Sequence, residues 1–267
     1  MQDDAGEEAV PVSGRTLVVM PTYDERGNIR STLSGVLARC PQVDILVVDD
    51  GSPDGTGVLA DGMARSDRRI RVIHRAGKQG LGPAYLEGFR WALDQGYDTI
   101  CEMDMDGSHR PADLVRILAV LASDPCLDLV IGSRRVKGGR TANWPWYRDL
   151  ISRGGSLYAR IMLGLSARDV TAGFRAYRAR ILKRIPLDQV RSNGYVFQID
   201  MLRRVLASGG HVAEVPIVFV ERKVGSSKMS SSIVAEAMVQ VTRWGVERLR
   251  EGLRSVPRKA GCRHSGR

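Results

Sequence analysis

The sequence of 267 residues lacks the long apolar segments that mark membrane-spanning and secreted proteins. No run of about 18 consecutive apolar residues is present, and a spanning helix needs about that length. The first residues, MQDDAGEEAVPVSG, are acidic and contain no apolar core of the kind found in signal peptides. We therefore expect a protein that is cytoplasmic, or peripheral on the cytoplasmic face of a membrane.

Cysteine is scarce, and the four cysteines are too dispersed to form a recognisable ligand set. Neither a CxxC pair nor a Cys/His spacing typical of zinc sites occurs, which argues against a structural zinc site and against a disulfide framework. This pattern fits a reducing compartment. The isolated histidines, His74, His109 and His211, show no ligand spacing, and we expect structural or surface roles for them.

Two common nucleotide-binding motifs are also missing. No GxxxxGK[ST] segment is present, so the sequence does not support a P-loop phosphotransferase. The segment GKQGLG (77–82) contains glycines and a lysine, but in the wrong order. No GxGxxG follows the first predicted strand, so we do not expect a dinucleotide cofactor.

The sequence does contain a regular alternation of short apolar runs and amphipathic segments. The apolar runs predict strands at 15–20, 44–49, 69–74, 98–103 and 127–132, and the segments between them predict helices at 26–40, 54–66, 81–95 and 111–122. Continuous apolar runs between helices are typical of parallel strands buried on both faces. The first half therefore predicts a doubly wound α/β domain with a mostly parallel central sheet.

The second half is less regular. It predicts a loop rich in Gly, Arg and Trp at 134–149, helices at 147–163 and 196–210, a turn leading into a helix at 170–182, and a strand at 211–222. A flexible polar loop is expected at 223–232, and a last helix at 233–254. We divide the chain into a disordered acidic N-terminus (1–14), one domain (15–232), an amphipathic helix (233–256) and a basic tail (257–267).

Polar residues follow the predicted strands, where ligands of open parallel sheets bind. These segments are PTYDER (21–26), DDGSPDGT (49–56), DMDGS (104–108) and SRR (133–135). Asp104 and Asp106 stand at positions i and i+2 after a buried strand, so an extended backbone points both carboxylates the same way. Two such anions can hold one divalent cation that also binds substrate phosphates. The alternative is that both aspartates only cap the helix that starts near Pro111.

Several blocks together resemble the dolichol-phosphate mannose synthases and polyprenol monophosphomannose synthases of glycosyltransferase family 2. They are PTYDERGNI, VVDDGSPDGT, GLGPAYLEGFRWAL, MDMDGSHRP, GSR, ISRG, TAGFRAYR, GYVFQIDML and EVPIVFVERKVGSSKM, from about Arg15 to Met229. The resemblance implies a GT-A fold, which is a Rossmann-like nucleotide-sugar-binding fold, with 15–232 as its catalytic domain. It also implies inverting transfer of mannose from GDP-mannose to a polyprenyl phosphate, with Mg²⁺ or Mn²⁺ as cofactor.

The resemblance further implies roles for single residues. The catalytic residues would be Asp104, Asp106 and Arg134, and the metal ligands would be Asp104, Asp106 and Ser108. The acceptor phosphate would be bound by Arg148, Ser152 and Arg153. The nucleotide sugar would be bound by Pro21, Tyr23, Glu25, Val48, Asp50, Met103, Asp104, Met105, Asp106, Arg134, Arg222 and Lys228.

The net charge of +10 leaves the type of partner open, because a basic chain can bind nucleic acid or an anionic membrane. Because the acceptor would be a lipid, we expect the protein to work at a membrane surface, where a separate membrane-anchoring subunit could bind it. We do not expect nucleic acid among its partners. The helix at 233–254 would lie on the membrane or, alternatively, pack on the catalytic domain. The loop 223–232 would close over the substrates as a lid, or serve as a plain linker. The alternative activity is a glucosyl- or aminoarabinosyl-type transferase that uses a UDP-sugar, and a less favoured one is a non-catalytic nucleotide- or nucleic-acid-binding protein.

Overall fold

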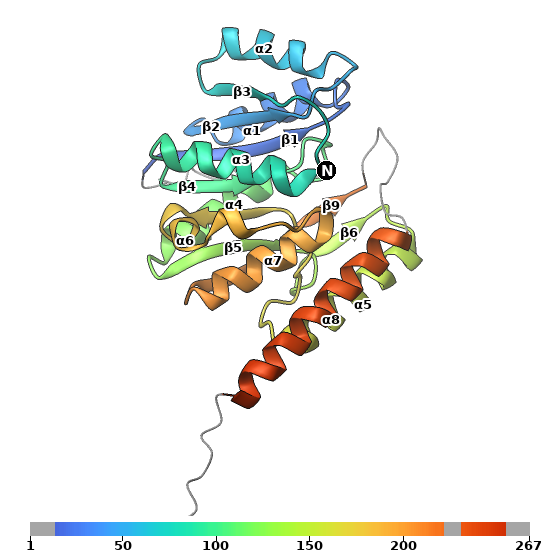
Figure 1. The fold of residues 1–267 in the computed structure, drawn as a ribbon. Coiled ribbons are helices and arrows are strands. Elements are labelled where there is room, and N and C mark those ends of the chain that lie inside the picture. The colour runs from blue at the N-terminus through green and yellow to red at the C-terminus, as the bar shows by residue number, and fades with distance from the viewer. Residues whose placement is uncertain (1–13, 222–230, 255–267) are drawn as a thin grey trace, which may run out of the picture.

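The structure, a computed structural model, describes residues 14–221 and 231–254. A seven-stranded sheet in the order β3-β2-β1-β4-β7-β5-β8 forms its centre (Figure 1). Within it, β7 pairs antiparallel with both neighbours and the other pairings are parallel. The strands are β1 (Thr16–Thr22), β2 (Val43–Asp49), β3 (Ile70–His74), β4 (Thr99–Glu102), β5 (Leu127–Ser133), β7 (Arg175–Arg178) and β8 (His211–Pro216).

Helices cover both faces of this sheet. One face is covered by α1 (Ile29–Arg39), α2 (Thr56–Ser66) and α4 (Pro111–Ser123), and the other by α3 (Leu81–Asp94), α6 (Ala179–Arg184) and α7 (Gly194–Ala207). Successive residues of β1 alternate between the two cores, because Val18 and Met20 join the first and Leu17 and Val19 join the second. This arrangement confirms the predicted GT-A-like α/β fold with a mostly parallel central sheet.

The five strands and four helices predicted in the first half are all present, with small differences at their ends. The strand β7 was not predicted, because Arg175 and Arg178 make half of its residues polar. Both arginines satisfy their guanidinium groups on backbone carbonyls, for example Arg175 Nη2 on Val170 (3.0 Å) and Arg178 Nε on Leu127 (2.9 Å). The predicted turn and the helix that follows it, α6, are both present at 170–182, but the prediction missed the strand between them.

The predicted strand at 211–222 is divided into two. Its first part is β8, and its second part, β9 (Val218–Val220), pairs with β6 (Arg140–Ala142) in a separate two-stranded sheet. The strand β6 lies inside the segment predicted as a loop. These two short strands lie beside one end of α5 (Figure 1).

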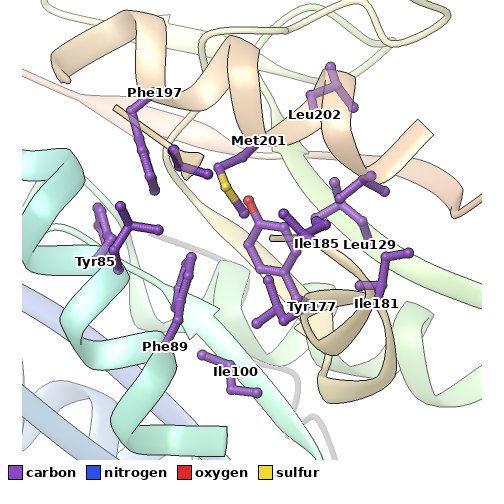
Figure 2. Packing of buried hydrophobic residues seen from close by; sticks show 14 of the residues in the cluster. Tyr85, Phe89, Ile100, Leu129, Tyr177, Ile181, Ile185, Phe197, Met201 and Leu202 are labelled. Carbon is purple, nitrogen blue, oxygen red and sulfur yellow. The ribbon is translucent and has the colours of Figure 1, made fainter. Parts of the chain in front are cut away.

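Aromatic side chains fill the core between α3, α7 and the sheet (Figure 2). The rings of Tyr85 and Phe197 stack with centroids 5.9 Å apart, and Phe89 meets Tyr177 edge-on at 5.6 Å. All four side chains are fully buried. This packing fixes Tyr85 near the start of α3, close to the turn after β4 that carries Asp104 and Asp106, which we call the aspartate turn.

The helices α5 (Trp146–Leu163) and α8 (Ser231–Arg254) lie side by side at one side of the molecule (Figure 1). Gly245 allows their close approach, because a Cβ atom there would lie 2.7 Å from Cε of Met162. Val241 is buried in the α3/α7 core, and the ring of Trp244 lies 4.7 Å from the guanidinium of Arg203 on α7. Among the helices at 14–221 and 231–254, none combines the length and the hydrophobicity that a membrane span requires.

Candidate active site

The loops that follow β1 and β2 are joined to each other at the carboxyl edge of the sheet. The N–H of Asp50 donates to the carbonyl of Thr22 (3.0 Å), and the N–H of Glu25 donates to Oγ1 of Thr56 (3.0 Å). Three of the predicted nucleotide-binding residues, Tyr23, Glu25 and Asp50, lie on these two loops, and a fourth, Pro21, lies at the end of β1. The structure therefore brings together residues that are more than 20 positions apart in the sequence.

The segment after β3 lies beside these two loops, and its residues were not among the predicted site residues. Arg75 is buried and forms an ion pair with Asp50, and a second ion pair of 3.0 Å joins it to Glu87. Nζ of Lys78 lies 4.1 Å from the ring centroid of Tyr23. The signal was available, because Arg75 directly follows a predicted strand in the same way as the aspartates do.

Three of the predicted nucleotide-binding side chains, those of Val48, Met103 and Met105, lie in the hydrophobic core. Val48 and Met103 are both fully buried, and they belong to the cores on opposite faces of the sheet. Contacts to a ligand at the rim would therefore come from their backbones.

The aspartate turn follows β4 directly. Met103 and Met105 both pack into the core under α1 and α4, as alternation on an extended segment requires. Asp104 accepts a hydrogen bond from the hydroxyl of Tyr85 (3.3 Å), and Asp106 accepts one from the N–H of Ser108 (3.0 Å). We call the segments 21–26, 49–56 and 103–109, at the ends of β1, β2 and β4, the acidic rim.

The side chain of His109 is buried and forms a hydrogen bond with the backbone of the aspartate turn. Its Nδ1 accepts the N–H of Asp104 (3.1 Å), so the neutral ring carries its proton on Nε2. The ring stacks on Phe174 (4.6 Å) and meets Phe219 edge-on (5.3 Å). Burial lowers the pKa of His109 to about 4, so the ring stays neutral at physiological pH. The expectation of a structural role for this histidine agrees with these contacts.

The residues of the turn fit a divalent cation that is completed by ligands from outside the chain. No group of three or more His, Cys, Asp or Glu side chains in the described ranges could hold a metal by itself. The hydroxyl of Ser108 is buried and has no hydrogen-bond partner among the described residues. Two carboxylates beside such a hydroxyl suit Mg²⁺ or Mn²⁺, since Mg²⁺ usually keeps water and substrate phosphates in its shell.

At the end of β4, immediately before the aspartate turn, the carboxylate of Glu102 is fully buried. It accepts hydrogen bonds from the hydroxyl of Tyr177 (2.9 Å) and from Nε2 of Gln198 (2.7 Å). Burial raises its pKa to about 7, although the charge of Arg175 and these two bonds favour the ionised form. The contacts tie the end of β4 to β7 and α7, immediately before the aspartate turn.

Arg134, at the end of β5, is buried and oriented by Asp169. Its Nε and Nη2 form a bidentate pair with this carboxylate, at 2.7 Å each, and Nη2 also reaches Oγ1 of Thr171 (3.0 Å). Burial alone would raise the pKa of Asp169, but the charge and hydrogen bonds of Arg134 outweigh it and hold the pKa below its usual value. The guanidinium also lies 5.6 Å from the ring centroid of Trp144 and 5.5 Å from that of Phe219.

The first half of α5 carries the three residues predicted to bind the acceptor phosphate. Arg148 pairs with Glu221 (2.6 Å) and lies 4.4 Å from the ring centroid of Trp144. Ser152 accepts a hydrogen bond from Nη2 of Arg135 (3.0 Å). Arg135 was not predicted to take part in the site.

Asp149 holds two arginines beside Ser152. It pairs with Arg135 (2.5 Å) and with Arg153 (2.6 Å). Burial raises the pKa of Asp149, but hydrogen bonds from both arginines outweigh this effect and lower it. We call Arg135, Arg148, Ser152 and Arg153 the basic cluster.

Two aromatic residues connect the acidic rim to the basic cluster. The ring of Phe219 on β9 contacts His109 and, at 5.4 Å, the ring of Trp144, over which Arg148 lies. The N–H of Val220 donates to the carbonyl of Ser108 (3.1 Å). The aspartate turn, Arg134 and Arg148 thus surround one pair of rings. Arg222, Lys228 and the loop predicted to act as a lid lie outside the described residues.

Comparison with known proteins places this geometry in context. A family model described as glycosyl transferase family 2 matches residues 17–186. A Micrococcus luteus protein named undecaprenyl-phosphate mannosyltransferase is 54% identical over 241 residues, which cover 90% of this chain and 98% of the relative. The polyprenol monophosphomannose synthase of Mycolicibacterium smegmatis is 50% identical over 260 residues, which cover 96% of this chain and 97% of the relative.

Solved structures of a more distant protein share the fold. Glucosyl-3-phosphoglycerate synthase from Mycobacterium tuberculosis, in complex with Mn²⁺, uridine diphosphate and glucosyl-3-phosphoglycerate, superposes with a TM-score of 0.64 at 19% identity. The match covers 88% of this chain and 80% of that protein.

Proposed function

Because the chain belongs to glycosyltransferase family 2, we propose that it transfers mannose from GDP-mannose to a polyprenyl phosphate and releases GDP. The observation that carries the proposal is the meeting of the acidic rim with the basic cluster around Phe219 and Trp144. The acidic rim suits a nucleoside diphosphate with its cation, and the basic cluster suits the phosphate of the acceptor. The names of the two relatives support mannose as the sugar and a polyprenyl phosphate as its acceptor.

On the donor side, the acidic rim would hold the nucleotide sugar. Tyr23, Glu25 and Asp50 would bind its nucleoside, with Arg75 keeping the Asp50 carboxylate in place. Asp104 and Asp106, with the hydroxyl of Ser108, would hold Mg²⁺ or Mn²⁺. When bound, the cation supplies positive charge that stabilises the departing diphosphate.

On the acceptor side, the basic cluster would hold the lipid phosphate. A phosphate monoester has a second pKa near 6, so it is mostly ionised at neutral pH and is already nucleophilic. The site therefore needs positioned cations more than a strong base, and arginine gives planar, bidentate contacts to phosphate. Arg148 and Arg153 would bind the phosphate, with Ser152 as a further hydrogen-bonding group.

The reaction would then proceed as a single displacement. A phosphate oxygen of the acceptor attacks the anomeric carbon as the bond to GDP breaks, and the electron pair of that bond leaves with the β-phosphate. Attack from the opposite side inverts the anomeric centre. Arg134 lies between the two sides in a buried, fixed orientation, where its charge would favour the transition state.

The reactants suggest where the protein works. Because the acceptor is a lipid phosphate, we place the enzyme peripherally on the cytoplasmic face of the membrane, with room for a separate membrane-anchoring subunit. Nucleic acid is not among the partners that we propose.

The test is incubation of the protein with GDP-mannose, Mg²⁺ or Mn²⁺ and a short polyprenyl phosphate, with GDP and mannolipid as the products measured. UDP-glucose serves as the matched donor control. We expect turnover only with GDP-mannose. Consumption of UDP-glucose instead, or binding of nucleic acid with no sugar turnover, would contradict the proposal.

A further inference from the structure

The outer face of α5 carries a row of exposed apolar side chains. Exposure is highest at Trp146 (77%) and Ile161 (69%). At 3.6 residues per turn, the row covers an arc of about 140° and runs along about 24 Å of the helix. We call it the α5 apolar stripe, and it consists of Trp146, Tyr147, Leu150, Ile151, Leu157 and Ile161.

The stripe lies opposite the face by which α5 packs on the protein. The buried residues of α5 are Ser156, Ala159 and Leu163, and helical geometry places them about 180° from the centre of the stripe. The stripe is therefore not the core-facing side of a surface helix. A contiguous apolar patch on a surface helix marks an interaction surface.

The stripe continues onto α8. The hydroxyls of Tyr158 on α5 and Thr242 on α8 lie 2.6 Å apart and join the two helices at the edge of the stripe. Exposed apolar residues of α8 share the side of that helix on which Thr242 lies. They are Met238, Val239, Val246 and Leu249. The two helices together present one apolar surface.

Arginines border this surface on both sides. Helical geometry places Arg153 and Arg160 next to the stripe on the edge of α5 away from α8, and Arg243 and Arg250 next to the exposed apolar residues of α8. The side chains of Arg153 and Arg243 are 62% and 72% exposed. Four further basic residues and no acidic one follow α8 in the sequence 255–267.

Apolar and aromatic side chains between two rows of arginine match the chemistry of an anionic lipid surface. Aromatic residues suit the boundary between headgroups and acyl chains, and arginines suit the phosphates of the headgroups. A second copy of the chain would place these arginine rows against like charges, so a protein dimer fits the surface less well.

We propose that the outer faces of α5 and α8 lie on an anionic bilayer, with the α5 apolar stripe as the main contact. This inference rests on the proposed function, since a lipid acceptor requires the site to reach a bilayer. The same helix that carries Arg148 and Ser152 then lies at the depth of the lipid phosphates. The sequence predicted membrane contact for the helix at 233–254. In this proposal α8 contributes to the membrane contact, but part of its apolar face packs on the protein through Val241.

The test uses the double variant Leu157→Gln and Ile161→Gln, because both residues lie on the stripe and outside the candidate active site. The full-length protein is mixed with vesicles of phosphatidylcholine with or without phosphatidylglycerol, and the bound fraction is measured by flotation. We expect the unmodified protein to prefer the anionic vesicles and the variant to bind them at least tenfold more weakly. Val58→Gln is the matched control, because Val58 is 74% exposed but lies on α2.

A second readout separates this inference from the proposed function. With a short, water-soluble polyprenyl phosphate, we expect the double variant to keep the activity of the unmodified protein. With a long-chain acceptor in vesicles, its KM should rise. Equal vesicle binding by the double variant and the unmodified protein would overturn the inference, as would a stable dimer that the double variant abolishes. Absence of turnover with either acceptor would overturn the proposed function and leave the vesicle result standing.

Discussion

The acidic rim and the basic cluster carry opposite charges and are held in place by different means. In the rim, the carboxylates directly follow the ends of β1, β2 and β4, so the sheet sets where their backbone lies, and buried neighbours such as Arg75 and Tyr85 then hold the side chains. In the basic cluster, side chains pair with side chains, as in Arg135 with Asp149 and Arg148 with Glu221, which are 14 and 73 positions apart. The difference implies that the rim is a fixed binding surface, whereas the cluster depends on how α5 packs.

The largest effect is expected from Asp106→Asn in the acidic rim. The substitution keeps the size of the side chain and its acceptor oxygen for Ser108, but removes the charge that would face a cation. We expect kcat/KM to fall by about 10³-fold, since electrostatic stabilisation is often the largest catalytic contribution. The measurement is GDP release at saturating Mg²⁺ or Mn²⁺. Asp94→Asn, in an exposed aspartate at the end of α3, is the control, and near-normal activity of Asp106→Asn would remove the metal role from the rim.

A smaller and more selective effect is expected from two arginine variants that are compared directly. Arg148→Ala should raise the KM for the polyprenyl phosphate by roughly 10- to 100-fold, the loss of one charged contact to phosphate. Arg75→Ala should instead raise the KM for GDP-mannose, because it frees the Asp50 carboxylate. Steady-state kinetics with each substrate varied in turn would show this split. If both variants changed the same KM, the assignment of the two sides would be wrong.

The smallest effect on activity is expected at the buried carboxylate of Glu102, where the change is in the stability of the fold. The pKa of this carboxylate is raised to about 7, so the folded state binds the proton more tightly than the unfolded state does. The resulting stabilisation is complete below pH 4.5 and is lost as the pH rises to 7, with a cost on the order of 3 kcal/mol above that pH. Glu102→Gln remains neutral and should avoid this loss.

The measurement is urea unfolding of both proteins between pH 5 and pH 8. The free energy of unfolding of Glu102→Gln, relative to that of the unmodified protein, should increase over this range. His109, whose pKa is lowered to about 4, contributes the opposite slope, but it does so in both proteins and cancels in the difference. Parallel curves would show that Glu102 is ionised throughout.

The sequence predicted the acidic rim better than the basic cluster. Asp104 and Asp106 were identifiable because a buried strand must end before them, and the ends of parallel strands share one edge of the sheet. Arg148, Ser152 and Arg153 were named only through a family resemblance. Their partners Arg135 and Glu221 depend on tertiary packing that spacing cannot reveal.

Other residues of the site could not be recognised from the sequence, because their pattern is the same as that of ordinary core residues. Tyr85 belongs to the apolar face of α3, and only the structure shows that its hydroxyl reaches Asp104. His109 had no ligand spacing in the sequence, and only the structure shows that its ring contacts the backbone of Asp104 and the rings of Phe174 and Phe219. The α5 apolar stripe was hidden for a similar reason, since an amphipathic pattern does not tell which face of a helix is covered.

The antiparallel strand β7 also sets the distance between the ends of β4 and β5 at the site. In the described sheet it is the one strand between β4, which is followed by the aspartate turn, and β5, which is followed by Arg134. With neighbouring strands about 4.8 Å apart, those two ends are separated by roughly 10 Å, which is a width suited to a diphosphate with its sugar. Because β7 runs the other way, the segment that enters it lies at this edge, and it supplies Asp169 to Arg134 and Phe174 to His109. Because Asp169 and Phe174 lie on one short stretch of chain, inserting or deleting a single residue between 169 and 174 would displace the contacts on both sides of the gap at once.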